Sequence, residues 1–341
     1  MYEAYYGLRE RPFDLTANPR FLFMTPGHRE ALSTIQYGIA GRKGITLLVG
    51  PAGTGKTTLV HAAVERQAGG RDGKALILTN PTLTREEFFE FLALEFGLSE
   101  RASHSKLHLL RELKETLTKR HAAAIVTALI VDEAQAMPDD LLEEVRLLAN
   151  METATDKLLP VVLVGQLELA VRLKDARLQQ LRQRIALRAT LAPLTRAETS
   201  AYIAERIRIA GGDVRKVFAS DAISTIYQCS GGIPRIISVL CDNALVSGFA
   251  LDQRPIRRAV IDEVRSDFDL EFVRDVEDSR DGASASGHLR IAPPADPGPA
   301  KDPHSMFASL PPRSRPDTED PQLQEPYAPQ RGFRSIFGRI S

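Results

Sequence analysis

The chain has 341 residues, of which 43% are hydrophobic and 26% are charged, so it is long enough for about two domains and is not disordered throughout. Its 44 lysines and arginines balance its 44 aspartates and glutamates, which excludes a histone-like or polybasic protein. Cys229 and Cys241 are the only cysteines. They are too few for a disulfide framework, and we expect buried thiols in a reducing compartment.

The sequence predicts a cytoplasmic protein without a membrane span. The first six residues lack the basic and apolar regions of a secretory signal. The longest apolar run, residues 122–131, is interrupted by Thr127 and falls well short of the roughly 18 residues that cross a bilayer.

Short β-branched apolar runs alternate with longer helical patterns in the first 280 residues, which predicts an α/β fold with a parallel sheet. Two helices are expected between the second and third strands, at residues 85–96 and 105–119. The five predicted strands span residues 45–49, 75–79, 128–131, 160–164 and 185–191.

No strand pattern follows Thr195, so three regions are predicted. Residues 1–194 form the α/β domain, with a lead-in at 1–44, and residues 195–275 form a small helical domain. A hinge is expected at residues 191–194.

Residues 276–341 are expected to form a disordered tail, because 11 of the 21 prolines fall within residues 281–341 and apolar residues there are scattered. At its end, residues 331–341 combine three arginines with apolar residues at helical spacing. This segment is either a peptide that docks on a membrane or a partner, or a chance pattern that frays in water.

Residues 50–57, GPAGTGKT, match the phosphate-binding pattern G-x-x-x-x-G-K-[ST] between a predicted strand and a predicted helix. Lys56 is expected to reach the β- and γ-phosphates and Thr57 to offer its hydroxyl to Mg²⁺, so ATP and Mg²⁺ are the predicted cofactors. The predicted nucleotide-binding residues of this loop are Gly50, Pro51, Ala52, Gly53, Thr54, Gly55, Lys56, Thr57 and Thr58.

Two acids follow the third strand, and a glutamine follows the fourth. Asp132 is expected to hold the magnesium ion, and Glu133 to orient and deprotonate the attacking water, unless the pair merely caps a helix. Gln166 is predicted to contact the γ-phosphate or the water as a sensor; the alternative is an ordinary turn residue.

Arginines supply two further predictions. Arg184, and after it Arg182, precede the fifth strand and are predicted to serve the nucleotide of a neighbouring subunit, unless they form a solvated helix end. In the helical domain, Pro234 begins a helix, and Arg235 is predicted to reach the γ-phosphate and couple nucleotide state to domain angle. The alternative for Arg235 is a surface position.

The motif order GPAGTGKT, LIVDEAQ, VVLVGQ, LRQRIALR and GGIPR resembles AAA+ ATPases of the ExeA/GspA type, the general secretion pathway protein A family. The resemblance covers about residues 1–275. It implies an origin-recognition-like AAA+ core with a helical lid, a homo-oligomer, and service to a cell-envelope machine. Residues 5–13 and 37–39 are similar to the family's lead-in, which helps to enclose the adenine.

The chain departs from secretion members, which continue into a membrane span and a periplasmic domain, so polysaccharide-export and pilus systems are also open. The leading hypothesis is a Mg²⁺-dependent ATPase that couples ATP hydrolysis to conformational change or oligomer remodelling, with an envelope or membrane-associated partner and a place at the inner membrane face. One alternative is a DNA-binding regulator of the transposition (TniB-like) type, although acids interrupt its basic groups. The other is a nucleotide-gated scaffold with little turnover.

Overall fold

A computed structural model describes residues 1–15, 19–68 and 74–268. The predicted tail, including its basic end at residues 331–341, lies outside the described residues. Cys229 and Cys241 are both buried and unbridged, as expected, and burial raises the pKa of each thiol. Among the described helices, none is both long enough and apolar enough to cross a bilayer.

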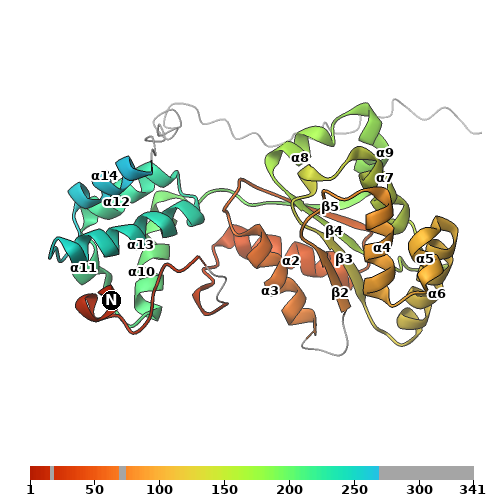
Figure 1. The fold of residues 1–341 in the computed structure, drawn as a ribbon, viewed down its shortest axis with the longest axis horizontal. Coiled ribbons are helices and arrows are strands. Elements are labelled where there is room, and N and C mark those ends of the chain that lie inside the picture. Colours follow the sequence, from red (N-terminus) through yellow and green to blue (C-terminus); the bar gives the residue numbers. More distant parts are fainter. Residues whose placement is uncertain (16–18, 69–73, 269–341) are drawn as a thin grey trace, which may run out of the picture. The chain divides into compact units, whose positions relative to one another are not determined.

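A five-stranded parallel sheet forms the centre of the α/β domain (Figure 1). Its strand order is β2-β3-β4-β1-β5, which places the strand before the phosphate loop between β4 and β5. The strands are β1 (Ile45–Val49), β2 (Lys74–Leu78), β3 (Thr127–Val131), β4 (Val161–Gly165) and β5 (Ile185–Thr190). All five predicted strands are present, with ends that differ from the predicted ones by a single residue at most.

Helices cover both faces of the sheet, and successive residues of a strand serve different faces. Leu48 faces α2 and α3, whereas Leu47 faces the layer that contains α4, α6 and α7. The helices are α2 (Pro26–Ala40), α3 (Lys56–Ala68), α4 (Arg85–Phe96), α5 (Glu100–His104), α6 (Lys106–Ala122), α7 (Asp139–Ala149), α8 (Leu167–Arg172) and α9 (Gln179–Arg184).

The two helices predicted between the second and third strands are present as α4 and α6. Thr84 caps α4 in a reciprocal pair with Glu87, so the start of this helix is encoded locally. The pattern missed the single-turn α5 between them, which is too short to display a helical period.

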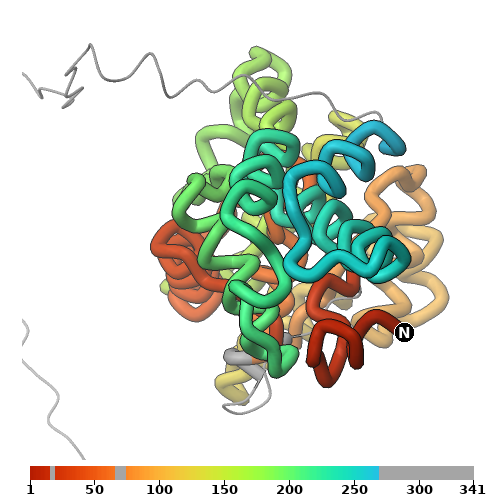
Figure 2. Tube along the Cα trace, turned by 90° about the vertical axis from the view of Figure 1, so that its left-hand side faces the viewer, coloured from red at the N-terminus to blue at the C-terminus, as the bar shows by residue number. Residues whose placement is uncertain are grey.

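The helical domain contains α10 (Arg196–Ile209), α11 (Val214–Val217), α12 (Ser220–Ser230), α13 (Pro234–Ala250) and α14 (Arg258–Asp267). Its core also includes residues from the beginning of the chain. The side chains of Tyr2, Tyr6 and Phe13 are buried among those of α10, α12 and α13. Figure 2 shows this first segment, which includes α1 (Tyr2–Tyr6), beside α13.

The first residues therefore pack with the helical domain, although they were predicted to belong to the α/β domain. Sequence order alone favours grouping them with the neighbouring α2, which does pack on the sheet. The chain thus passes between the two cores twice, once between Phe21 and α2 and once near Leu194.

At the second crossing, Leu194 N donates to Gly232 O over 2.8 Å. Gly232 has φ +75°, and a Cβ atom there would lie 1.9 Å from Leu194 O. Gly97, which ends α4, has a similar φ of +66° but nothing within 4 Å of an added Cβ. Substituting each glycine therefore distinguishes the cost of left-handed backbone strain, present at both positions, from the cost of steric overlap, present only at Gly232.

We expect Gly97→Ala to lower the free energy of unfolding by about 1 kcal/mol, from left-handed strain alone. Gly232→Ala adds an overlap with backbone at the crossing, so we expect a loss of about 3 kcal/mol. Urea unfolding of the two variants against the parent protein measures both values. Equal losses would contradict the close contact at Gly232.

Candidate nucleotide-binding site

The phosphate loop joins β1 to α3, and the carbonyl groups at its start accept hydrogen bonds from side chains of the loop itself. Gly53 and Gly55 have φ of +77° and +90°, which an L side chain rarely adopts. Lys56 Nζ donates to Gly50 O and Pro51 O at 2.9 Å each, and Thr54 Oγ1 donates to Pro51 O at 2.9 Å. Burial lowers the pKa of Lys56, against the opposing charges of Glu133 and Asp132.

Thr57 and Asp132 meet at the carboxyl edge of the sheet. Thr57 Oγ1 donates to Asp132 Oδ2 at 2.5 Å, and Asp132 is 5% exposed. A hydroxyl and a carboxylate are hard oxygen donors, and Mg²⁺ in nucleotide sites typically takes one or two such ligands along with phosphate oxygens. The residues predicted to hold the ion therefore fit it.

Glu133 lies next to Asp132 in a left-handed conformation, with φ +52°. Its Oε2 atom accepts hydrogen bonds from the side-chain amides of Gln135 and Gln166, the latter at 3.3 Å. Gln135 Oε1 in turn accepts from Gln166 N at 2.9 Å. The predicted sensor and the predicted base are thus in direct contact.

Arg172, on α8, holds the segment that carries Gln135. Its Nη1 donates to Gln135 O at 2.6 Å and its Nη2 to Met137 O at 3.0 Å, and it also pairs with Asp139. Neither Gln135 nor Arg172 was predicted from the sequence. Gln135 follows Glu133 by two residues, which is the only local signal available.

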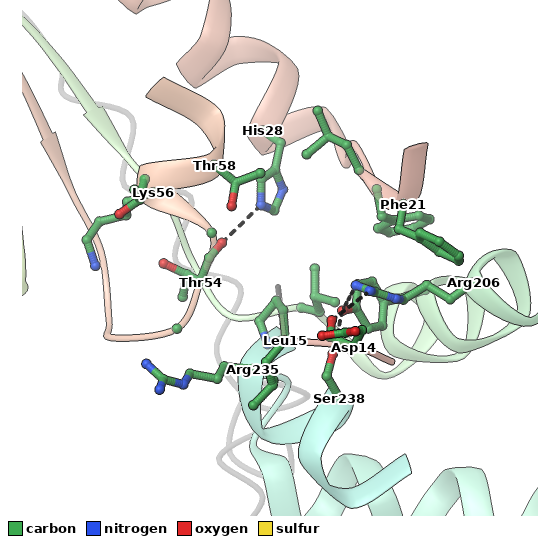
Figure 3. A pocket seen from close by; sticks show the side chains of 18 of the residues that line it. Asp14, Leu15, Phe21, His28, Thr54, Lys56, Thr58, Arg206, Arg235 and Ser238 are labelled. Atoms are coloured by element: carbon green, nitrogen blue, oxygen red, sulfur yellow. Dashed lines mark hydrogen bonds between the residues drawn. The ribbon is translucent and has the colours of Figure 1, made fainter. Parts of the chain in front are cut away.

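A cavity of about 470 Å³ lies between the phosphate loop, residues 14–15 and 21–23, and the helical domain (Figure 3). Of the predicted site residues, it is lined by Gly53, Thr54, Gly55, Lys56, Thr57, Thr58, Glu133, Pro234 and Arg235. Gly50, Pro51, Ala52, Asp132 and Gln166 do not line it; the first three form the base of the loop.

The cavity wall on the side of the helical domain is a polar network framed by aromatic rings. Arg206 Nη1 donates to the hydroxyl of Tyr202, which is 2.8 Å from Ser238 Oγ, and Arg206 Nε donates to Pro12 O. The guanidinium lies 5.1 Å from the centre of the Phe21 ring and 5.3 Å from that of Tyr202. Sequence reasoning missed these residues because they are far apart in the chain.

None of the residues in the segments 5–13 and 37–39, which were expected to help enclose the base, lines the cavity. Tyr6 is buried in the helical-domain core and Tyr37 is 56% exposed on α2. Phe21, Leu22 and Phe23 line the cavity instead.

Arg235 is the second residue of α13 and lies beside the phosphate loop. Its backbone N–H donates to Gly53 O at 3.2 Å, and a Cβ atom at Gly53 would lie 2.8 Å from Arg235 Cβ. A backbone hydrogen bond thus joins the helical domain directly to the loop.

Arg182 and Arg184 do not line the cavity. Arg184 precedes β5, and its carbonyl lies near Gly44, just before β1. The register pairs Ile45 with Ile185 at this end and Val49 with Thr190 at the other. Arg184 is therefore at the amino edge of the sheet, roughly 15 Å of strand from the phosphate loop of its own chain.

Residues 39–173 match the AAA domain family. The chain is 38% identical over 250 residues to general secretion pathway protein A of Aeromonas hydrophila, a match that covers 73% of this chain and 45% of the relative. The chain thus spans less than half the length of this curated relative.

Solved structures share the fold at low identity. The ORC2 protein of Aeropyrum pernix, in ADPNP–ADP complexes, superposes with a TM-score of 0.57 at 18% identity, covering 80% of this chain and 74% of that one. Cdc6p of Pyrobaculum aerophilum gives 0.59 at 16% identity, covering 75% and 70%. The chain therefore carries an AAA domain and is similar to general secretion pathway protein A, and the solved structures share its fold.

Proposed function

We propose that the protein is a Mg²⁺-dependent ATPase. The observation that carries this proposal is the meeting of Lys56, the Thr57–Asp132 pair and Glu133 at one edge of the sheet. Lys56 exchanges its loop carbonyls for the β- and γ-phosphates when ATP binds. Thr57 and Asp132 hold the metal ion, which when bound neutralises charge on the phosphates.

Glu133 acts as the base for hydrolysis. The carboxylate accepts a proton from water as the water oxygen bonds to the γ-phosphorus and the bond to the ADP oxygen breaks. The amides of Gln135 and Gln166 fix the orientation of the carboxylate. Because Gln166 has N–H donors and lies at the same edge, it is suited to contact the γ-phosphate as well.

Arg184, and secondarily Arg182, act on the nucleotide of a neighbouring subunit. The distance of Arg184 from its own phosphate loop supports action in trans, because an arginine at the amino edge does not reach the carboxyl edge of the same sheet. The protein therefore works as a homo-oligomer in this proposal.

The hydrolysis cycle drives the helical domain through Arg235, whose bond to Gly53 joins that domain to the loop. The similarity to general secretion pathway protein A supports a role in a cell-envelope secretion system, at the inner membrane face. Because the chain spans 45% of that relative, this role and its membrane-associated partner are part of the proposal. No contact in the described residues favours the DNA-regulator alternative.

We expect Glu133→Gln to slow ATP hydrolysis by about 100-fold or more while leaving ATP binding intact, because the amide cannot accept the proton. Steady-state hydrolysis with Lys56→Ala as the blank measures the loss. Adding anionic liposomes or double-stranded DNA to the assay shows which of them stimulates ATP hydrolysis. Unchanged turnover in Glu133→Gln would contradict the role of the base, and a near-zero rate in the parent under all conditions would favour the scaffold.

We expect Arg184→Ala alone and Lys56→Ala alone to reduce turnover about 100-fold or more. Their equimolar mixture should hydrolyse ATP well above the sum of the two, because Lys56→Ala subunits supply Arg184 to intact phosphate loops of Arg184→Ala subunits. Arg111→Ala, whose side chain is exposed and paired with Glu115 on α6, is the control and should resemble the parent. A mixture no more active than its parts would rule out action in trans.

A further inference from the structure

The carbonyl groups of the phosphate loop need hydrogen-bond donors. In a phosphate-binding loop the amides face the phosphates, so the carbonyls face the surrounding protein, and those that are buried need a donor. Lys56 and Thr54 serve Gly50 O and Pro51 O from within the loop segment. Gly53 O and Thr54 O are served from outside it, by Arg235 N and by His28.

His28 occupies the first turn of α2 and is 7% exposed. Its Nε2 lies 3.2 Å from Thr54 O, and its Nδ1 lies 2.7 Å from the hydroxyl oxygen of Thr25, the N-cap residue. Figure 3 shows the ring directed at the loop between Thr54 and Thr58.

The partners assign the ring proton. Thr54 O is only an acceptor, so Nε2 carries the hydrogen and donates it. Thr25 Oγ1 already accepts from the backbone N–H of His28 at 3.2 Å, so its own hydrogen is free for Nδ1. The chain of donors therefore runs from Thr25 through the imidazole to the phosphate loop.

His28 differs from the other donors in how it responds to nucleotide. Lys56 leaves its carbonyls when it binds phosphate, and Arg235 N belongs to the helical domain, which the proposed cycle moves. His28 belongs to α2, whose residues Leu32 and Ile35 are buried against the sheet. It is the donor from outside the loop that stays in place throughout the cycle.

We propose that His28 is a positioning residue of the nucleotide site. It holds the Thr54 carbonyl outward, so that the following amides of Gly55 and Lys56 face the phosphates before nucleotide arrives. The inference rests on the proposed nucleotide binding, and assigns to this site a side chain that belongs to none of the sequence motifs.

The test compares three substitutions of similar size. Gln places an amide N–H close to where Nε2 lies. The side chain of Asn also carries an amide N–H but is too short to reach that place, and Leu has no N–H in its side chain. We measure the dissociation constant of a fluorescent ADP analogue, and KM and kcat for ATP, in the full chain. A melting temperature for each variant separates loss of folding from loss of binding.

We expect His28→Asn and His28→Leu to bind the ADP analogue about 3- to 10-fold more weakly, the worth of one hydrogen bond. His28→Gln should bind within about twofold of the parent. KM should rise more than kcat falls, because the groups that act on water are intact. Thr25→Ser should resemble the parent, whereas Thr25→Val, which cannot orient the imidazole, should bind as weakly as His28→Asn.

Equal affinities across the His28 series would overturn this inference while leaving nucleotide binding in place. Gln no better than Asn would also overturn it, since the effect would then be one of packing. A parent protein that binds no ADP analogue, like Lys56→Ala, would overturn the proposed function and this inference together.

Discussion

A phosphate site made of backbone amides requires that the carbonyls of the same loop be satisfied on the other side. In this protein that requirement organises the surroundings of the loop. The carbonyl of Gly53 accepts a hydrogen bond from the helical domain, and that of Thr54 accepts one from α2. The carbonyls of Gly50 and Pro51 accept hydrogen bonds from Lys56. Whatever replaces these donors or moves them acts directly on the shape of the nucleotide site.

The two acids at the end of β3 are likewise held by hydrogen bonds from their surroundings. Asp132 is bonded to Thr57 and also to the backbone N–H of Glu133, and Glu133 is held by two amides. Arg172 holds Gln135, which carries one of those amides, by donating a hydrogen bond to its backbone carbonyl. The carboxylate proposed to take the proton is thus oriented by a chain of bonds that reaches α8. Such orientation lowers the reorganisation needed when the reaction occurs.

The parts of the fold and site that were predictable from the sequence are those encoded within a few residues. The five strands follow from short apolar runs, and the phosphate loop and Asp132 follow from motifs that adjoin a strand. His28, Arg206 and the packing of Tyr2 with α13 depend on contacts between distant segments. In the local sequence, His28 resembles any residue at a helix start, Arg206 any basic residue of a helix, and Tyr2 part of an aromatic terminus. No periodicity therefore predicts their contacts. Gln135 is local, but its role becomes evident only when β4 brings Gln166 beside it.

The positions of the two kinds of charged residue bear on how the proposed oligomer is built. The phosphate loop, Asp132 and Glu133 lie at the carboxyl edge of the sheet, and Arg184 lies at the amino edge. An interface that brings Arg184 to the site of another subunit therefore joins two different surfaces. Such head-to-tail contacts repeat from subunit to subunit and generate rings or filaments rather than a two-fold dimer of like surfaces. Each nucleotide then lies between two copies of the chain, so that hydrolysis in one subunit is sensed by the next through the arginine it presents.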